Sequence, residues 1–361
     1  MKITFCIPSL GSGGAERVVS VLANKFVENG HDVSVIMLSH LLCVYPLSEK
    51  VNVVCLECDE DGKLPFVKRY PLRLKKIRNA VKKLSPDVVI SFMSETNTDV
   101  CFALSGMNIP VIVSERNDPA IDPASKVKQI MRRVAYTKPK GFVFQTPDAQ
   151  AYFSKRIQKS SKIILNPLTA ALPEPFEGER EKRVVAVGRL NKQKNYPMLI
   201  DAFEDFVASF PEYVLEIYGE GPLEQRIKEY IKGKILEDKV MLKGFCKEVH
   251  NKTLTASMFV MSSDFEGMPN ALLESLAIGL PCISTDCPCG GPRMLIKSYE
   301  NGILVPVNDK TKMAEAMKYM AGHPEESKMM AQNAVNVRKR ADVDEIVKEW
   351  LEIVNTCKEK K

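Results

Sequence analysis

The chain has 361 residues, of which 45% are hydrophobic and 27% are charged, a balance typical of an ordinary soluble globular protein with two domains. No apolar run approaches the roughly 18 residues that span a bilayer. The N-terminal stretch MKITFCIPSLGSGG is too short in its apolar part for a signal peptide and ends in glycines. These features argue against membrane-spanning and exported classes, and they predict a cytoplasmic protein.

Short β-branched runs alternate with amphipathic helical patterns in the first half of the chain, which is typical of βαβ units and a parallel sheet. A glycine loop and a helix over residues 15–29 follow the first expected strand. The expected strands, in chain order, are KITFCIP, DVSVIML, VNVVCLE, PDVVISF, PVIVSE, GFVFQT and KIILNPL.

The pattern restarts after residues 169–182, a proline-rich and charged stretch without apolar periodicity that predicts an interdomain linker. The expected strands beyond it are RVVAVGRL, LEIYGEG, VMLKGF, MFVMSS and PCISTD. We therefore predict an α/β protein with two doubly wound parallel-sheet domains, 1–168 and 183–341, and a final helix in 342–361. Two such sheets would offer the carboxyl ends of their strands to a shared cleft.

The ten cysteines suggest neither a disulfide framework nor a metal site. Cys55 and Cys58 form one CxxC, and no second CxxC or nearby histidine completes a tetrahedral site. Cys282, Cys287 and Cys289 cluster near a Pro/Gly loop, again without a further type of ligand. Reduced thiols that pack as small hydrophobic side chains are the expectation.

Positive charge is concentrated in the first half of the chain. Residues 1–167 carry a net charge of +9 and the remainder −3, within a total of +6. The segment 67–83 has eight basic residues, no acid, and apolar residues at helical spacing, and a second basic cluster follows over 126–140. Contact with an anionic membrane surface is one interpretation and a solvated helix face is the alternative. Few stacking aromatics and no binding motif argue against nucleic acid.

The glycine loop GSGGAER at residues 11–17 resembles a dinucleotide fingerprint only in part. Gly11 and Gly13 fit G-x-G, but the sixth position is Glu16, and the second strand ends in MLSH without an acid for a ribose. An NAD-dependent oxidoreductase is therefore disfavoured.

Two cations follow the first strand of the second half. Arg189 and Lys194 lie in GRLNKQKN, where the carboxyl edge of the sheet is expected. A planar guanidinium and a compact ammonium together suit a diphosphate, while ordinary surface cations remain the alternative.

The stretch DFEGMPNALLESLAIGLP, residues 264–281, places two glutamates with seven residues between them. Glu266 falls in the loop after a strand, and Glu274 in the second turn of a helix that begins near Pro269 and stops at Gly279. The two carboxylates do not share a helical face, so a shared proton between them is not expected. Backbone N–H groups at the helix start suit sugar hydroxyls or a phosphate.

These motifs, GGAER, VGRL with a lysine five residues beyond its arginine, IYGEGP, LKGF and E-x7-E, resemble in this order the retaining glycosyltransferases of family 4, which have the GT-B fold. The resemblance implies that the second domain binds a nucleotide sugar and that the last helix folds back onto the first domain. Arg189 and Lys194 would neutralise the diphosphate, Glu266 would bind the sugar hydroxyls and Glu274 the ribose. The remaining implied donor contacts are Gly14, Gly244, Phe245, Gly267, Met268, Pro269 and Asn270.

The resemblance also implies the chemistry. Transfer would retain the anomeric configuration by front-face attack, with Glu266, Arg189 and Lys194 as the catalytic set and without a metal or other cofactor. Many relatives have a histidine after the strand equivalent to PVIVSE, whereas this chain reads SERNDP, wording that resembles a subgroup building polysaccharides, some on lipid-diphosphate carriers. The candidates for acceptor or sugar contacts there are Glu115, Arg116, Asn117 and Asp118, and loop capping by Asn117 or Asp118 is the alternative. No catalytic histidine is assigned.

The expected function is transfer of a hexose or N-acetylhexosamine from a UDP-sugar, in preference to a GDP-sugar, to a glycan acceptor. The resemblance to polysaccharide-building relatives favours a lipid-linked acceptor at the inner face of the cytoplasmic membrane. A nucleotide-sugar epimerase on the same fold and a non-enzymatic two-lobed binding protein are the alternatives.

Overall fold

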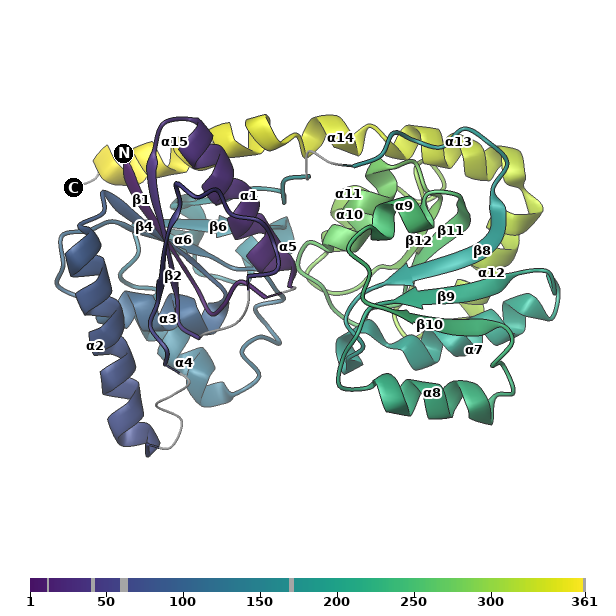
Figure 1. Ribbon diagram of the computed structural model, residues 1–361, viewed down its shortest axis with the longest axis horizontal. Helices are drawn as coiled ribbons and strands as arrows, with labels where there is room; N and C mark the ends of the chain where they lie inside the picture. The colour runs from purple at the N-terminus through teal and green to yellow at the C-terminus, as the bar shows by residue number, and fades with distance from the viewer. Residues whose placement is uncertain (12, 40–42, 59–63, 169–171, 360–361) are drawn as a thin grey trace. The chain divides into compact units, whose positions relative to one another are not determined.

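In the computed structural model the chain forms two compact units, described here over residues 1–11, 13–39, 43–58, 64–168 and 172–359 (Figure 1). Unit 1 comprises Met1–Pro167 together with Ala341–Lys361, and unit 2 comprises Leu168–Arg340. One residue of the glycine loop, Ser12, lies outside the described residues, as do 169–171 of the predicted linker and the last two residues of the chain.

The sheet of unit 1 contains seven parallel strands in the order β3-β2-β1-β4-β5-β6-β7. Apart from its first residue β1 is buried, and β4 is buried throughout, because helices cover both faces of a parallel sheet; such strands therefore appear in the sequence as continuous apolar runs. All seven predicted strands are found, although β7 ends at Ile163 and so covers only the first two residues of the predicted KIILNPL. Their bounds are β1 Lys2–Ile7, β2 Asp32–Met37, β3 Asn52–Cys55, β4 Val88–Phe92, β5 Val111–Ser114, β6 Gly141–Phe144 and β7 Ser161–Ile163.

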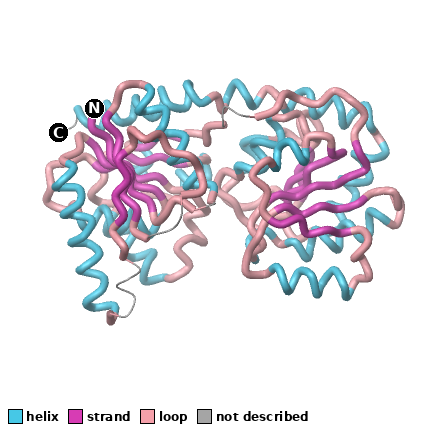
Figure 2. The backbone as a smooth tube through the Cα atoms, in the orientation of Figure 1, coloured by secondary structure: helices cyan, strands magenta, loops and turns pink. Residues whose placement is uncertain are grey.

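The helices of unit 1 form two layers (Figures 1 and 2). Helix α2 contacts α3, α3 contacts α4, and α1 contacts the C-terminal helix α15. Because the chain steps from β1 to β2 and from β4 to β5 in opposite directions, right-handed crossovers place α1 and α3 on opposite faces of the sheet. The bounds are α1 Gly14–Glu28, α2 Phe66–Leu84, α3 Ser94–Ala103, α4 Lys126–Ala135, α5 Pro147–Ala151, α6 Lys155–Lys159 and α15 Val343–Glu359.

Helix α15 completes the core of unit 1, as the resemblance led us to expect. Its apolar residues Ile346, Val347, Trp350 and Val354 are almost fully buried in one cluster with residues of β1, β2 and α1. A Cβ atom on Gly141, at the start of β6, would lie 2.5 Å from Cys357 Sγ. Only glycine therefore permits the end of α15 to approach the sheet this closely.

The sheet of unit 2 contains six parallel strands in the order β10-β9-β8-β11-β12-β13. The five predicted strands are confirmed, and the three-residue β13 was not predicted because so short a run carries little pattern. The strands are β8 Glu181–Val187, β9 Val214–Tyr218, β10 Val240–Gly244, β11 Ala256–Met261, β12 Cys282–Thr285 and β13 Ile303–Val305. The helices are η2 Lys192–Lys194, α7 Tyr196–Val207, α8 Glu224–Gly233, α9 Val249–Thr253, α10 Asn270–Ala277, α11 Gly291–Leu295, α12 Lys310–Gly322, α13 Pro324–Ala334 and α14 Val337–Arg340.

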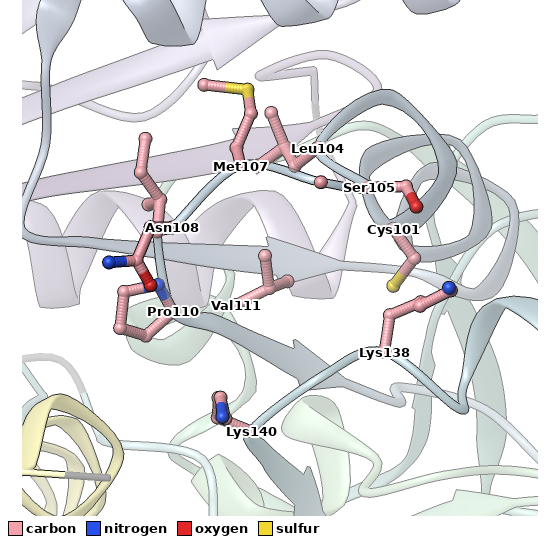
Figure 3. A pocket seen from close by; sticks show the side chains of 11 residues that line it. Cys101, Leu104, Ser105, Met107, Asn108, Pro110, Val111, Lys138 and Lys140 are labelled. Carbon is pink, nitrogen blue, oxygen red and sulfur yellow. The ribbon is translucent and has the colours of Figure 1, made fainter. Parts of the chain in front are cut away.

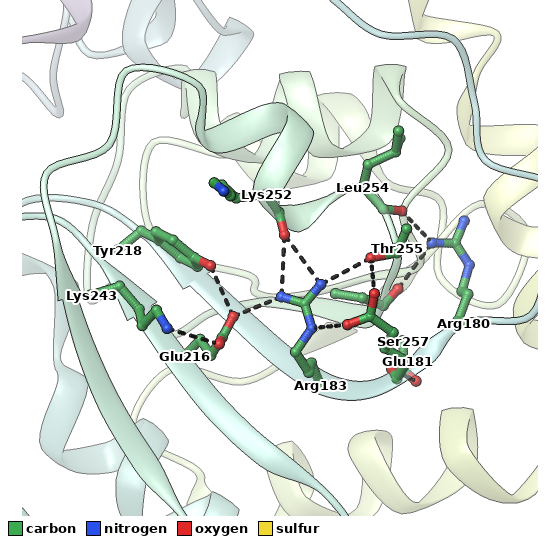
Figure 4. Close-up of polar contacts among 11 residues, drawn as sticks. Arg180, Glu181, Arg183, Glu216, Tyr218, Lys243, Lys252, Leu254, Thr255 and Ser257 are labelled. Atoms are coloured by element: carbon green, nitrogen blue, oxygen red, sulfur yellow. Dashed lines mark hydrogen bonds and ion pairs between the residues drawn. The ribbon is translucent and has the colours of Figure 1, made fainter.

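An arginine-centred network secures the first strand of unit 2 (Figure 4). The Arg183 guanidinium donates to Glu181 Oε2 at 2.6 Å, to Glu216 Oε2 at 2.7 Å and to the Lys252 carbonyl oxygen at 3.2 Å. Burial alone would raise the pKa of Glu216, but hydrogen bonds from Arg183 and Tyr218 outweigh it and hold the pKa below its usual value. The network joins β8, β9 and the turn before β11, so it supports the sheet rather than a ligand site.

All ten cysteines are free thiols. Seven of them are buried, as expected of thiols that pack as small hydrophobic side chains, whereas Cys55 and Cys246 are half-buried and Cys43 is exposed. None of the helices in the described residues is both long and apolar enough to cross a membrane.

Candidate functional site

The predicted donor residues of unit 2 gather at the carboxyl edge of its sheet. Strand β8 has β9 on one side and β11 on the other, so the strand order changes direction between β8 and β11. In open parallel sheets, ligands bind outside the carboxyl ends of the strands at such a switch point. Arg189 and Lys194 follow β8, and Glu266 follows β11, which places all three beside this point.

Lys194 and Glu266 form an ion pair. Lys194 Nζ lies 2.6 Å from Glu266 Oε1, and the Ser263 hydroxyl donates to the same oxygen at 2.7 Å. The two side chains are only 16% and 10% exposed. A pair so shielded from water interacts more strongly than a surface pair.

Backbone contacts fix the loop of Lys194 against the loop of Glu266. The Asp264 N–H donates to the Gln193 carbonyl oxygen at 2.8 Å, and Gln193 Nε2 donates to the Phe265 carbonyl oxygen at 2.8 Å. The Ser262 hydroxyl donates to the Lys194 carbonyl oxygen at 2.7 Å. The relative position of the ammonium and the carboxylate is therefore set by both chain segments rather than by the side chains alone.

Arg189 is an exposed cation at the same edge. Its guanidinium makes no hydrogen bond or ion pair with any residue that the structure describes, whereas the carbonyl oxygen of the preceding Gly188 accepts from the Tyr196 hydroxyl at 2.9 Å. An uncompensated guanidinium beside a switch point is suited to an anionic ligand group.

Glu274 lies on α10, is 5% exposed and pairs with a histidine. His250 Nε2, from α9, lies 2.8 Å from Glu274 Oε2. The sequence analysis did not find this partner of Glu274, because the two residues are 24 positions apart and lie on separate helices. No spacing rule could have paired them. The contact fixes the orientation of the Glu274 carboxylate.

The segment between the two glutamates is packed tightly. Gly267, Met268 and Pro269 are buried, Asn270 is half-buried, and α10 begins at Asn270, one residue after the expected start. A Cβ atom on Gly291 would lie 1.8 Å from the Gly267 carbonyl oxygen, so the first residue of α11 must be glycine for α11 to pack against this segment.

The predicted nucleobase residues lie at the end of β10. Gly244 has a φ of +69°, which favours glycine, and turns the chain so that Phe245 follows with 47% of its surface exposed. The Phe245 N–H lies 3.4 Å from Glu220 Oε1, which links this turn to the loop after β9.

In unit 1, Gly14 is the exposed first residue of α1, directly after β1 and the glycine loop. Asn117 and Asp118 serve as loop caps: Asn117 Oδ1 accepts from the Asp118 N–H at 3.0 Å, and Asp118 Oδ1 accepts from the Ala120 N–H at 2.9 Å. The capping alternative therefore describes the local geometry of both residues.

Arg116 is held inside unit 1 by rings and by an amide. Its guanidinium lies 4.3 Å from the ring centre of Phe92 and 5.6 Å from that of Trp350, and Nη1 donates to Asn166 Oδ1 at 2.7 Å. Burial lowers the pKa of Arg116 to about 9. These contacts tie the SERND loop to α15. Arg116 Nε and Nη2 are buried without a hydrogen-bond partner among the described residues, and the contact of Arg116 with acceptor or sugar stays a prediction.

Glu115 is 2% exposed and belongs to a buried polar network. The Tyr136 hydroxyl donates to Glu115 Oε1 at 2.5 Å, and Arg132 Nη1 lies 3.9 Å from the same oxygen. Burial raises the pKa of Glu115 to about 7, although the positive charge of Arg132 acts in the opposite direction. These contacts give Glu115 a role in the fold of unit 1, and its contact with acceptor or sugar stays a prediction.

The raised pKa of Glu115 predicts a pH-dependent stability of unit 1. Between its ordinary pKa of 4.5 and about 7, the folded chain keeps a proton that the unfolded chain has lost. The free energy of unfolding should therefore fall as the pH rises through this range, by about 1.4 kcal/mol per pH unit. Urea unfolding followed by tryptophan fluorescence measures the free energy of unfolding at each pH. Glu115→Gln is the control, because glutamine does not titrate in this range. Parallel pH profiles for the two proteins would contradict the prediction.

Comparison with known proteins agrees with this architecture. The family model described as Glycosyltransferase Family 4 matches residues 12–168, and that described as Glycosyl transferases group 1 matches residues 171–337. A Campylobacter jejuni enzyme named GalNAc-alpha-(1->4)-GalNAc-alpha-(1->3)-diNAcBac-PP-undecaprenol alpha-1,4-N-acetyl-D-galactosaminyltransferase is 32% identical, over 99% of this chain and 99% of its own.

Two further comparisons extend the likeness. A second Campylobacter jejuni enzyme, named N-acetylgalactosamine-N,N'-diacetylbacillosaminyl-diphospho-undecaprenol 4-alpha-N-acetylgalactosaminyltransferase, is 28% identical over 88% of this chain and 90% of its own. The crystal structure of Anabaena HepE in complex with UDP superposes with a TM-score of 0.82 at 16% identity, covering 99% of this chain and all of the other.

Two Rossmann-like units, each with an all-parallel sheet, define the GT-B class of glycosyltransferases. Within that class, the chain belongs to glycosyltransferase family 4.

Proposed function

We propose that the protein transfers a hexose or N-acetylhexosamine from a UDP-sugar to a lipid-linked glycan, with retention of configuration, in surface polysaccharide synthesis. The observation that carries the proposal is the shielded Lys194–Glu266 pair at the switch point of unit 2, beside the unpaired Arg189. Two relatives whose names specify glycans on undecaprenyl diphosphate, and a UDP complex of the same fold, support the choice of acceptor and donor.

Each donor residue has a proposed role that follows from its place. Arg189 and Lys194 neutralise the diphosphate, Glu266 accepts from sugar hydroxyls, and Glu274, oriented by His250, accepts from the ribose hydroxyls. The backbone of 267–270 at the start of α10 faces the sugar and phosphates, where a helix N-terminus favours negative charge. Gly244 and the exposed Phe245 border the base.

The proposed reaction is a front-face substitution. The acceptor oxygen bonds to the anomeric carbon on the face from which UDP leaves, and the bond between that carbon and the β-phosphate oxygen breaks with its electron pair going to the phosphate. The acceptor proton passes to the leaving phosphate. Lys194 and Arg189 stabilise the charge that grows on the diphosphate in the transition state, which is where fixed cations accelerate a reaction most.

We propose that the two cations take the place of a metal ion. Their charges face the region where the diphosphate is expected, so activity should be unchanged after EDTA treatment and dialysis. Transfer rates before and after chelation, and after adding back Mg²⁺ or Mn²⁺, measure this. Activity that disappears with EDTA and returns with a divalent ion would contradict a metal-free reaction.

A donor screen tests the proposed function directly. UDP and UDP-sugars should raise the melting temperature of the protein, since a ligand that binds only the folded state stabilises it. The preferred donor should then label a lipid-linked glycan only when acceptor is present. A sugar converted in the absence of acceptor would point to an epimerase, and no stabilisation by any nucleotide sugar would remove the proposal.

We further propose that the protein works at the inner face of the cytoplasmic membrane, through the α2–α4 surface. This surface consists of the exposed residues of α2 and α4 that follow: Val67, Lys68, Lys75, Lys126, Val127, Ile130, Arg133 and Val134. Val127, Ile130 and Val134 are 67%, 64% and 53% exposed, at the spacing of one helix face. Apolar residues flanked by cations suit an anionic bilayer surface.

The apolar face that the sequence suggested for 67–83 is not part of this surface. Ile77 and Val81 are fully buried in unit 1, so the exposed face of α2 is basic and the exposed apolar face lies on α4. Arg132 of the second basic cluster is likewise 2% exposed and donates to the carbonyl oxygens of Asp122 and Pro119. The sequence-based membrane interpretation is therefore corrected at Ile77, Val81 and Arg132, which are buried in unit 1 and do not belong to the surface.

Membrane binding should depend on both parts of the α2–α4 surface. Replacing Lys68, Lys126 and Arg133 by glutamine should weaken binding to phosphatidylglycerol vesicles, by about 1 kcal/mol per charge near the surface. Ile130→Ser with Val134→Ser should weaken it further. Vesicle sedimentation measures the binding, and Lys155→Gln with Lys159→Gln on the exposed part of α6 is the matched control. Equal binding by the control and the surface variants would contradict the assignment.

A further inference from the structure

A cavity of about 140 Å³ in unit 1 lies beside Cys101, Val111 and Lys138, where β5 and β6 begin (Figure 3). Its lining residues all belong to the described part of the chain, and none of them has a buried side-chain nitrogen or oxygen without a partner. In open parallel sheets ligands bind outside the carboxyl ends of the strands, and this cavity lies at the amino ends. The cavity therefore carries no assignment.

The contact between His250 and Glu274 arises because two crossovers of unit 2 lie on the same face of its sheet. Helix α9 connects β10 to β11 and α10 connects β11 to β12, and both steps run in the same direction across the strand order. Right-handed crossovers in one direction cover one face, and Figure 1 shows α9 and α10 together on the face opposite α7 and α8. The chain that turns at Gly244 and Phe245, the predicted base residues, therefore reaches Glu274 through α9.

Helix α9 is fixed to the sheet of unit 2 by the protein itself. From β8, the Arg183 guanidinium donates to the Lys252 carbonyl oxygen at 3.2 Å (Figure 4). Thr253, the last residue of α9, is 3% exposed. Because its helix is held against the sheet, the imidazole of His250 is a firmly placed partner for Glu274.

The contact between the two side chains is short and shielded from water. His250 Nε2 lies 2.8 Å from Glu274 Oε2, and the side chains are 18% and 7% exposed. A carboxylate oxygen accepts hydrogen bonds, so Nε2 carries a proton and is the donor. This hydrogen bond restricts rotation of the carboxylate, while each carboxylate oxygen keeps more than one acceptor direction. Glu274 therefore presents its acceptors in a fixed plane.

We infer that His250 is the positioning residue that makes the donor site select ribonucleoside diphosphate sugars over their 2′-deoxy counterparts. The inference rests on the proposed contact of Glu274 with the ribose. The adjacent 2′- and 3′-hydroxyls offer two donors side by side, and a carboxylate in a fixed plane can accept from both. A site built to bind a hydroxyl group rejects the analogue that lacks it. A carboxylate that turned freely would accept from the 3′-hydroxyl alone and would lose this selectivity.

Binding of UDP and 2′-deoxy-UDP to the full chain, measured by calorimetry, tests the inference. The wild type should bind UDP at least about tenfold more tightly than 2′-deoxy-UDP. His250→Phe keeps a ring but cannot donate, so the Kd for UDP should rise about tenfold and the ratio of the two Kd values should fall below about three. His250→Gln, which restores an N–H donor, should keep the wild-type ratio. Asn251→Ala, at the exposed neighbour of His250, is the control that should also keep it.

Enzyme kinetics and a double variant separate positioning from a purely structural role. In His250→Phe, KM for the UDP-sugar should rise with the Kd while kcat at saturating donor changes little, because the ribose takes no part in bond breaking. His250→Phe combined with Glu274→Gln should bind UDP no more weakly than Glu274→Gln alone, since the two side chains act as one unit. A purely structural pair would lower the melting temperature of the free protein and leave the ratio of Kd values unchanged.

The outcomes distinguish this inference from the proposed function. If His250→Phe does not fold, His250→Asn replaces it, because the shorter side chain does not reach Glu274. Equal affinity of the wild type for the two nucleotides, or a ratio that His250→Phe or His250→Asn leaves unchanged, overturns the inference while the binding of UDP still supports the proposed function. Absence of UDP binding by the wild type overturns the proposed donor and the inference with it.

Discussion

Glu266→Gln is expected to lower kcat/KM for sugar transfer at least about a hundredfold, the scale measured when one preorganised polar group is removed from an active site. The amide keeps the shape of the carboxylate but loses its negative charge, and an NH₂ donor replaces one of its two acceptor oxygens. Both the contact with sugar hydroxyls and the pairing with Lys194 should therefore weaken. The Ser263 hydroxyl can still donate to the remaining carbonyl oxygen, so unit 2 should stay folded. Transfer assays together with circular dichroism measure the two effects separately.

Lys194→Ala should lower activity on a similar scale, and Lys192→Ala is the matched control. Lys192 is an exposed lysine of the same short helix η2, so its replacement changes the same net charge without touching Glu266. Because Lys194 and Glu266 are in direct contact, the double variant should lose less activity than the two single losses multiplied together. Full activity of Glu266→Gln, or strictly multiplicative losses in the double variant, would contradict a joint role at the donor.

The fold could be predicted because the strands of a parallel sheet covered on both faces consist of nearly continuous apolar residues. The apolar runs VVAV in β8 and VVISF in β4 predict buried strands. The sequence also placed Lys194 and Glu266 after strands of one parallel sheet, but their direct contact depends on β8 and β11 being neighbours, which was not predicted.

Contacts between side chains from unrelated segments could not be predicted. His250 and Glu274 lie on different helices, and their meeting depends on how α9 and α10 pack, which no local pattern records. The same holds for the ring of Trp350 over Arg116, which joins the end of the chain to the SERND loop.

The number of basic residues in 67–83 did not predict which of their side chains are exposed on the surface of α2. The sequence places Arg73 and Arg78 among the membrane-facing cations of 67–83, but Arg73 pairs with Asp99 and Arg78 donates to the carbonyl oxygens of Ala103 and Ser105. A run of basic residues on a helix fixes the composition of its faces only after the buried face is known. Here Ile77 and Val81 define that buried face.

Trp350→Ala should reduce the free energy of unfolding of unit 1 by about 3–5 kcal/mol, the usual cost of truncating a buried tryptophan. Trp350 is fully buried, its ring lies 5.7 Å from that of Phe92 at an angle of 21°, and it covers Arg116 from the side of α15. Removing the indole leaves a cavity where the helix meets the sheet and takes one of two rings from the buried guanidinium of Arg116.

Trp350→Phe should cost much less, because two of its effects oppose one another. The smaller ring loses packing, but the indole N–H of Trp350 is buried without a hydrogen-bond partner among the described residues, and removing such a group recovers about 1–3 kcal/mol.

Since Trp350 is the only tryptophan of the chain, urea unfolding of these variants must be followed by circular dichroism. Lys348→Ala, at an exposed position of α15, is the control. If Trp350→Ala unfolds at the same urea concentration as this control, the packing of Trp350 does not contribute to the stability of unit 1. That result would also contradict a stabilising contact between α15 and the SERND loop.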